Sequence, residues 1–375
     1  MKQTFDQNKA DSQATLIEPI QPGAFNLDAY ANYEAALMPR CKAFWEGRSG
    51  VLVYRRMRAA EVFSYGCQNW ERSLALQLGA LQKSMEYQAD IPNFLEPWYG
   101  IGTIASSFGI EYTWQNGQAP ALAPKFKSIK EALDAPVVPV KDTPIGHHTL
   151  NMIDCFLKET QGRMPLSLCD VQSPFNTAAM MVDMNALLTG FYDYPDQVIE
   201  LLDRIIRLLT DFTHEQVKRI GEPLVWPGHG FASSRLFEGL GMSDDYSILI
   251  SAEQYRQFAE SSLVRAAADF KGPVFHSCGN WSPLASVIKQ IPGLRMADGA
   301  FGLQTDPSPN KAELFPEIFA NSGIILNARI VGDSTVVAEQ VKKLWAPGMK
   351  LIVVTYCQNP EDQQRAYEWI HEICQ

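Results

Sequence analysis

A histidine and a cysteine stand two positions apart in the segment G-P-V-F-H-S-C-G-N-W, residues 272–281. Pro273 to Phe275 are apolar and indicate a short buried strand that ends just before His276 and Cys278. Residues two apart in an extended segment point to the same side, so both side chains can face one point. Imidazole nitrogen and thiolate sulfur are preferred ligands of zinc. The spacing therefore suggests a metal site, although a buried cysteine is more often a small, inert hydrophobe.

A catalytic zinc site needs a third protein ligand, and the best candidate is Cys357. This cysteine follows a second apolar segment, residues 351–354, which is also expected to be a strand. Asp170 and Glu96 are the next candidates if Cys357 does not bind the metal. Three protein ligands leave the fourth position of a tetrahedral zinc ion open, which is typical of catalytic rather than structural sites.

The elements that must position these residues alternate between strand and helix. Strands are expected at residues 50–55, 93–96, 165–169, 222–226, 273–275, 294–297, 323–326 and 350–354. Helices are expected at residues 27–46, 70–87, 174–188, 195–220, 252–270, 283–291, 311–320, 334–344 and 360–373. This alternation predicts an α/β fold, a (β/α)8 TIM barrel. A doubly wound open sheet is the alternative, but no G-x-G-x-x-G follows any strand.

The chain is expected to form one domain. Residues 1–22 are predicted to be an N-terminal arm, and residues 23–375 a single barrel with an N-terminal helical extension. The proline-rich stretch around residues 119–144 is interpreted as an insertion, because the alternation resumes beyond it without a change of composition.

Catalytic groups in such barrels come from the C-terminal ends of the strands. The long segment 227–252 after the expected fourth strand is predicted to be an ordered lid, and Asp244 or Asp245 in it could supply a carboxylate. Each residue taken alone is equally well explained as a helix cap or a loop hydrogen bond. The expected catalytic residues are Asp170 and Asp244, and the expected substrate contacts are Glu96, Trp226, His229, Asp298 and Asn327.

Composition excludes some partners. The net charge of −10 argues against a nucleic-acid or anionic-membrane surface. The polar N-terminal sequence has no apolar signal core, and no run approaches the roughly 18 apolar residues of a membrane span. Seven scattered cysteines are typical of reduced thiols, which predicts a cytoplasmic protein. A homodimer is the default expectation, since closed two-fold dimers are the commonest assemblies.

Three motifs together resemble the uroporphyrinogen decarboxylase superfamily. They are H-S-C-G-N before a helix, S-D-D before I-S-A-E-Q-Y-R-Q-F, and the apolar strand that ends near Cys357. The resemblance spans about residues 160–375 and, more weakly, 30–118, and it implies a (β/α)8 barrel.

Two branches of this superfamily must be separated. True uroporphyrinogen decarboxylases carry an R-Q-A-G-R-Y-type segment whose arginines hold the carboxylates of the substrate, whereas residues 51–58 here read V-L-V-Y-R-R-M-R. Corrinoid-dependent methyltransferases, such as the methylcobamide:coenzyme M enzymes, hold zinc through H-x-C and a distant cysteine. His276, Cys278 and Cys357 match that pattern, although Cys357 lies in T-Y-C-Q-N-P rather than in a glycine-rich segment.

The resemblance implies a zinc-dependent methyltransferase of a corrinoid methyl-transfer system. A methyl group would move between a corrinoid and a thiol or another small substrate. A thiol at the open zinc position is deprotonated by the cation, and the thiolate is the competent nucleophile. The chain has no D-x-H-x-x-G motif, so the corrinoid is expected on a partner protein. The alternatives are a carboxy-lyase of the uroporphyrinogen decarboxylase type and a non-catalytic barrel that binds a small molecule.

Overall fold

Six parallel strands form most of the barrel wall in the computed structural model, which describes residues 12–375. The strands are neighbours in the order β1-β6-β5-β4-β3-β2. Their bounds are β1 Gly50–Arg55, β2 Leu240–Ser243, β3 Pro273–His276, β4 Met296–Ala300, β5 Ile325–Ile330 and β6 Lys350–Thr355. β4, β5 and β6 are buried along their whole length, as expected for parallel strands covered by helices.

Short stretches of backbone close the gap between β1 and β2. Asp90 N donates to Val53 O of β1 at 2.8 Å, and Leu95 N donates to Pro165 O at 2.8 Å. Ser173 N, farther along the same stretch as Pro165, then donates to Ser243 O of β2 at 2.8 Å. These bonds complete the circuit around the barrel axis. The predicted α/β barrel is therefore confirmed.

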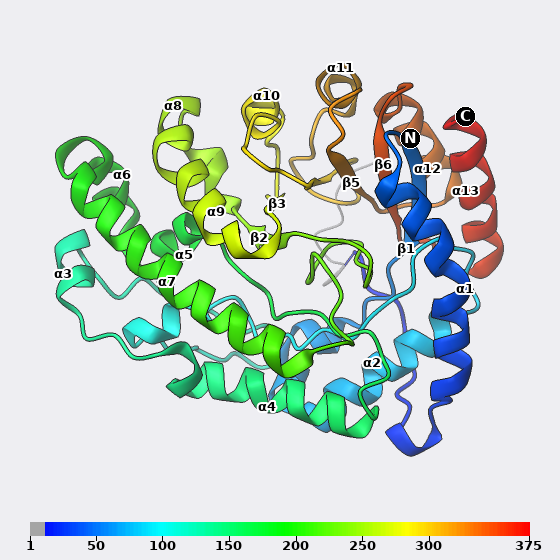
Figure 1. Cartoon of the computed structure of the whole chain (residues 1–375), viewed down its shortest axis with the longest axis horizontal. Helices are drawn as coiled ribbons and strands as arrows, with labels where there is room; N and C mark the ends of the chain where they lie inside the picture. Colours follow the sequence, from blue (N-terminus) through cyan, green and yellow to red (C-terminus); the bar gives the residue numbers. More distant parts are fainter. Residues whose placement is uncertain (1–11) are drawn as a thin grey trace.

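Helices surround the strands on the outside (Figure 1). The last helix lies beside the first, which brings the two ends of the barrel together. The bounds are α1 Leu27–Glu46, α2 Trp70–Ser84, α3 Ile129–Asp134, α4 Pro144–Glu159, α5 Pro174–Met181, α6 Met184–Asp193, α7 Pro195–Ile220, α8 Ala252–Gln254, α9 Ser261–Ala266, α10 Ala285–Ile288, α11 Phe315–Phe319, α12 Ser334–Leu344 and α13 Pro360–Ile373. A π-helical turn, Tyr255–Glu260, joins α8 to α9.

Four helices, α1, α7, α12 and α13, occupy the ranges predicted from the sequence. Their starts carry clear local signals. The side chain of Asn26 accepts a hydrogen bond from Ala29 N before α1, and that of Asn359 accepts one from Asp362 N before α13. Pro195 occupies the first position of α7, where a missing N–H has no cost.

The prediction for residues 222–252 is wrong in one respect. Residues 222–226 form only isolated bridges, and the strand that pairs with β3 is β2, inside the segment predicted to be a loop. Gly241 explains the error, because glycine in a short L-G-M-S segment is typical of a loop. A Cβ at this position would lie 2.5 Å from Phe231 Cε2 and 2.9 Å from Pro227 O. The glycine is therefore required by the close approach of the preceding segment.

The described part of the N-terminal segment, from residue 12 onward, contacts the barrel. Residues 1–11 of the predicted arm lie outside the described residues. Thr15 N donates to Arg58 O at 2.8 Å, and Ile20 N donates to Ala75 O of α2 at 2.8 Å. Within residues 12–375, no helix is long and apolar enough to cross a membrane.

Candidate functional site

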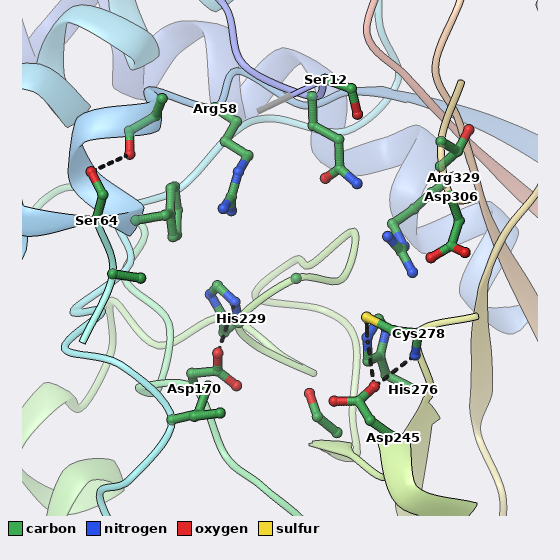
Figure 2. A pocket seen from close by; sticks show the side chains of 18 of the residues that line it. Ser12, Arg58, Ser64, Asp170, His229, Asp245, His276, Cys278, Asp306 and Arg329 are labelled. Carbon is green, nitrogen blue, oxygen red and sulfur yellow. Dashed lines mark hydrogen bonds and ion pairs between the residues drawn. The ribbon is translucent and has the colours of Figure 1, made fainter. Parts of the chain in front are cut away.

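A cavity of about 780 Å³ opens at the C-terminal ends of the strands. Its lining comes from widely separated parts of the sequence and includes Arg56, Asp170, His229, Asp245, His276 and Arg329. Figure 2 shows His276, Cys278 and Asp245 on one side of the cavity, and His229 with Asp170 on another. The position at the strand ends is the one expected for the active site of a barrel enzyme.

The first cluster contains three side chains with metal-binding atoms. In Asp245, His276 and Cys278, one ligand atom of each residue lies within 4.8 Å of the others. His276 Nε2 is 3.3 Å from Cys278 Sγ and 3.6 Å from Asp245 Oδ1. Cys278 N also donates to Asp245 Oδ1 at 2.6 Å, which ties the two loops together. Imidazole nitrogen, thiolate sulfur and carboxylate oxygen form a donor set that suits zinc.

Asp298 orients the imidazole of His276. Strand register places His276, Asp298 and Asn327 side by side on β3, β4 and β5. His276 Nδ1 lies 2.5 Å from Asp298 Oδ2, so that its N–H can donate to this carboxylate, while Nε2 on the other side of the ring faces Cys278 Sγ. A carboxylate behind a histidine is the usual arrangement in metal sites, because it fixes the tautomer and the ring orientation.

Asp298 is held in its charged form. The side chain is fully buried, and burial alone would raise the pKa of its carboxyl group. The positive charge of Arg329, whose Nε donates to Asp298 Oδ2 at 2.9 Å, and that of His276 outweigh this effect. Asn327 Nδ2 adds a hydrogen bond at 2.5 Å. The pKa of Asp298 is therefore lowered below its usual value.

Asp245, rather than its neighbour Asp244, faces the cavity. Ser243 and Asp245 both line the cavity, as residues two apart in an extended chain should. Asp244 is fully buried beneath them and accepts a hydrogen bond from Ser173 Oγ at 2.5 Å. Burial raises the pKa of Asp244 to about 7. The structure thus places the predicted catalytic carboxylate outside the lining.

Cys357 is not brought to the pair His276 and Cys278. It follows β6, its side chain is 1% exposed, and its Sγ lies 3.8 Å from Gly332 O. Burial raises the pKa of its thiol to about 12. Among the described residues, the group with converging ligand atoms contains Asp245 in the place where the sequence suggested Cys357.

The second cluster is a chain of ionisable side chains in contact with one another. Arg56 Nη2 lies 3.2 Å from Glu96 Oε1, and His229 Nδ1 lies 2.5 Å from Glu96 Oε2. His229 Nε2 is 3.2 Å from Asp170 Oδ2, and Trp98 Nε1 donates to the same oxygen at 3.1 Å. Burial alone would raise the pKa of Glu96, but Arg56 and His229 lower it to about 2. The predicted residues Glu96, Asp170 and His229 are therefore neighbours.

Other predicted contacts lie away from the cavity surface. Asp298 and Asn327 are fully buried behind His276. The ring of Trp226 lies 6.2 Å from that of Phe270 and borders a different hollow. Three arginines that were not among the predicted site residues also line the cavity, Arg56, Arg58 and Arg329. The first two were visible in the segment V-L-V-Y-R-R-M-R, and Arg329 stands two residues after Asn327 on the same strand.

The fold is an α/β barrel whose cavity lies at the strand ends and is lined by potential metal ligands. Residues 48–227 match the family model for uroporphyrinogen decarboxylase (URO-D). The match identifies a URO-D family domain in the chain and confirms the superfamily that the sequence motifs indicated. No curated protein sequence matches the chain.

A solved structure, described as a methyltransferase from Methanosarcina mazei, has a similar fold. The similarity covers 90% of this chain and 98% of that one, with a TM-score of 0.64 and 16% sequence identity. At this identity the likeness establishes the shared fold. The similarity extends across most of the chain, beyond the segment matched by the family model.

Proposed function

We propose that this protein is a zinc-dependent methyltransferase that moves a methyl group between a corrinoid on a partner protein and a small substrate. The observation that carries the proposal is the convergence of Asp245, His276 and Cys278 at the cavity. The similar fold of a protein described as a methyltransferase is in keeping with it. The H-x-C motif connects both observations to the zinc-dependent branch of the superfamily.

The chain offers a suitable environment for the metal. Cys278 is exposed to the cavity, and the contact with Asp298 keeps Nε2 of His276 facing it. Three protein ligands leave one position of a tetrahedral ion for substrate. When bound there, zinc supplies a Lewis acid that favours the deprotonated form of a thiol or polarises a methylated heteroatom. The substrate would occupy the space between the two side-chain clusters (Figure 2).

The alternative, a carboxy-lyase with a polyanionic substrate, has less support. Arginines in the lining could attract carboxylates, but Arg56 is paired with Glu96 and Arg329 with Asp298. These partners neutralise much of the positive charge that an acidic substrate would need. Release of carbon dioxide from uroporphyrinogen by the purified protein would favour the alternative.

Metal content of the purified protein tests the proposal. We expect about one zinc per chain, lost in His276→Ala and Cys278→Ala because the removed atoms are the strongest ligands. Zinc should bind more weakly to Asp245→Ala and normally to Cys357→Ala. Cys155→Ser is the matched control, because Cys155 is a partly exposed thiol outside the cavity lining.

Activity is tested with methylcobalamin and simple thiols, by the change in corrinoid absorbance. We expect methyl transfer by the zinc-loaded wild type and by Cys155→Ser, and none by Cys278→Ala. Loss of zinc in Cys357→Ala but not in Asp245→Ala would restore Cys357 as the third ligand. A wild type that binds no zinc and transfers no methyl group would rule the proposal out.

A further inference from the structure

Residues 12–20 of the N-terminal segment reach the cavity at the strand ends. Ser12 and Gln13 line the same cavity as Cys278. Figure 2 shows Ser12 and Arg58 along one edge of this cavity, and Asp245 on the other side. Any molecule bound near the candidate metal ligands therefore has the N-terminal segment as one of its boundaries.

Hydrogen bonds hold Thr15 against the backbone that follows β1. Ala14 forms a parallel bridge with Arg58, and Thr15 N donates to Arg58 O at 2.8 Å. The side chain of Thr15 accepts a hydrogen bond as well, from Arg55 Nη2 to Oγ1 at 2.9 Å. Thr15 is buried, with 6% of its surface exposed. These contacts fix the backbone next to the two residues that line the cavity.

The hydroxyl of Thr15 accepts a hydrogen bond from a buried positive charge. Arg55 is fully buried, and burial lowers the pKa of its guanidinium to about 10, so the group remains charged at neutral pH. Among the described residues, its side-chain acceptors are neutral oxygens, those of the Arg56 and Cys357 carbonyls and of the Thr15 hydroxyl. A buried charged donor that loses an acceptor is destabilised more than a neutral one. The Thr15 hydroxyl therefore ties the segment firmly to the barrel.

Helix α2 carries a glycine at the point where the segment crosses it. A Cβ at Gly79 would collide with Glu18 O and would lie 3.0 Å from Ile17 Cγ2. Glycine is unfavourable inside a helix, and the close approach of the segment explains its presence here. Ile17 is 8% exposed and belongs to the same apolar cluster as Met57 and Trp98. The segment is therefore packed into the fold on both sides of Thr15.

We propose that Ser12 and Gln13 are specificity-determining residues, which limit the size of the molecules that reach Cys278. Thr15 is a positioning residue, because it acts by fixing the backbone beside them. A hydroxyl and a carboxamide are uncharged and both donate and accept hydrogen bonds, so they suit an uncharged polar part of a substrate. This role belongs to the cavity and holds for any reaction that takes place there, including the proposed methyl transfer.

Access to Cys278 is measured by its reaction with a small and a large thiol reagent, iodoacetamide and pyrene maleimide. The full chain is first dialysed against EDTA, so that no metal protects the thiol. Mass spectrometry of peptides then gives the rate for each cysteine separately. Cys278 is exposed and Cys155 is partly exposed, whereas the other five cysteines are buried. Cys155 lies outside the cavity lining and serves as the internal reference.

Thr15→Val removes the anchor of the segment. We expect the rate of Cys278 with the maleimide to rise about 10-fold, because a buried donor without its acceptor increases the population of the released segment. The rate with iodoacetamide should change far less. Thr15→Ser retains the hydroxyl and should behave as the wild type does. The rates of Cys155 and of the buried cysteines should not change in either variant.

Ser12→Trp and Gln13→Trp test the lining directly and leave the anchor at Thr15 intact. Their larger side chains should slow the reaction of Cys278 with the maleimide several-fold and leave its reaction with iodoacetamide nearly unchanged. The matched control is Gln364→Trp, because Gln364 is exposed on α13, outside the cavity lining. This control should have the wild-type rates.

The role of the segment and the proposed function fail in different ways. An unchanged maleimide rate at Cys278 in both tryptophan variants would overturn the role of the lining, and an unchanged rate in a folded Thr15→Val would overturn that of the anchor. If Thr15→Val also exposes the buried cysteines, its effect is general loosening, and the tryptophan variants decide. A wild type without zinc and without methyl transfer would refute the proposed function and leave these rates unaffected.

Discussion

Asp298 is the residue on which the metal-binding orientation of His276 depends. Its carboxylate can accept a hydrogen bond from Nδ1–H, and without this contact the ring can rotate or change tautomer. We predict that Asp298→Asn lowers zinc affinity about 10- to 100-fold, as is typical for partners behind a metal ligand. Competition with a chromophoric chelator measures this change.

The control for Asp298→Asn is Asp269→Asn. Asp269 is an exposed carboxylate that also contacts a histidine, with Oδ2 3.0 Å from His214 Nε2. Its removal should leave zinc affinity unchanged. Equal zinc affinity in wild type and in a folded Asp298→Asn protein would mean that His276 is oriented by something else, or is not a ligand.

The sequence predicted those parts of the site whose geometry depends only on residues close together in the chain. The spacing of His276 and Cys278 brings both toward one point because residues alternate along a strand. The contact between His276 and Asp298 depends on the register of β3 and β4, which no local pattern encodes. The choice between Asp244 and Asp245 likewise required knowledge of β2 and of the side that it presents.

The strand β2 positions one of the candidate metal ligands, because Asp245 lies two residues beyond its end. Gly241 lets this strand pass close to the segment before it. In Gly241→Ala the added Cβ would crowd Phe231 and Pro227, and we predict a destabilisation of about 1–3 kcal/mol. Displacement of β2 should also weaken zinc binding. Urea unfolding and the chelator competition measure the two effects.

Gly23→Ala is the matched control for this substitution. A Cβ at Gly23 has no neighbour within 4 Å, and the position lies in a short turn before α1. The change should leave both stability and zinc affinity near the wild-type values. A Gly241→Ala protein of full stability would show that the wall at β2 can shift without cost, contrary to the close packing described above.

Helices and strands were predicted well where local sequence signals mark their ends, and poorly where pairing with distant segments determines their extent. α7 is a long amphipathic helix with proline at its start and Gly221 at its end, so its range follows from the sequence. Residues 93–96 and 165–169 contribute to the wall mainly through single bridges and backbone hydrogen bonds. Their extent as strands depends on neighbours that are distant in the sequence. The extent of these two strands is therefore determined by tertiary pairing and not by local amino-acid composition.

At the scale of the whole molecule, one buried carboxylate joins the start of the barrel to its end. Asp90 Oδ2 accepts from Val53 N of β1 at 2.8 Å and lies 3.0 Å from His371 Nε2 of α13. Asp90 Oδ1 accepts from Tyr367 OH at 2.7 Å and from Arg40 of α1. The side chain of Asp90 is fully buried. The carboxylate thus links α1, β1 and α13, where the ring of elements closes (Figure 1).

This closure makes stability depend on pH. Burial alone would raise the pKa of Asp90, but hydrogen bonds from His371, Arg40 and Tyr367 lower it. A carboxyl group whose pKa is lower in the folded chain than in the unfolded chain stabilises the fold above the unfolded value of about 3.9. That contribution is lost as pH falls further, through the folded pKa. We predict that Asp90→Asn lowers the free energy of unfolding by about 2 kcal/mol at neutral pH.

The difference between wild type and Asp90→Asn should shrink as the pH falls from about 5 to about 3, because the unfolded wild-type chain then binds a proton at Asp90 more readily than the folded chain does. Urea unfolding across this range measures it, with Asp154→Asn as the control. Asp154 pairs with Arg219 at 2.5 Å, but its side chain is 50% exposed, so its loss should change stability little at any pH. A constant gap between wild type and Asp90→Asn would mean that the size and shape of the side chain, rather than its charge, hold the ends of the barrel together.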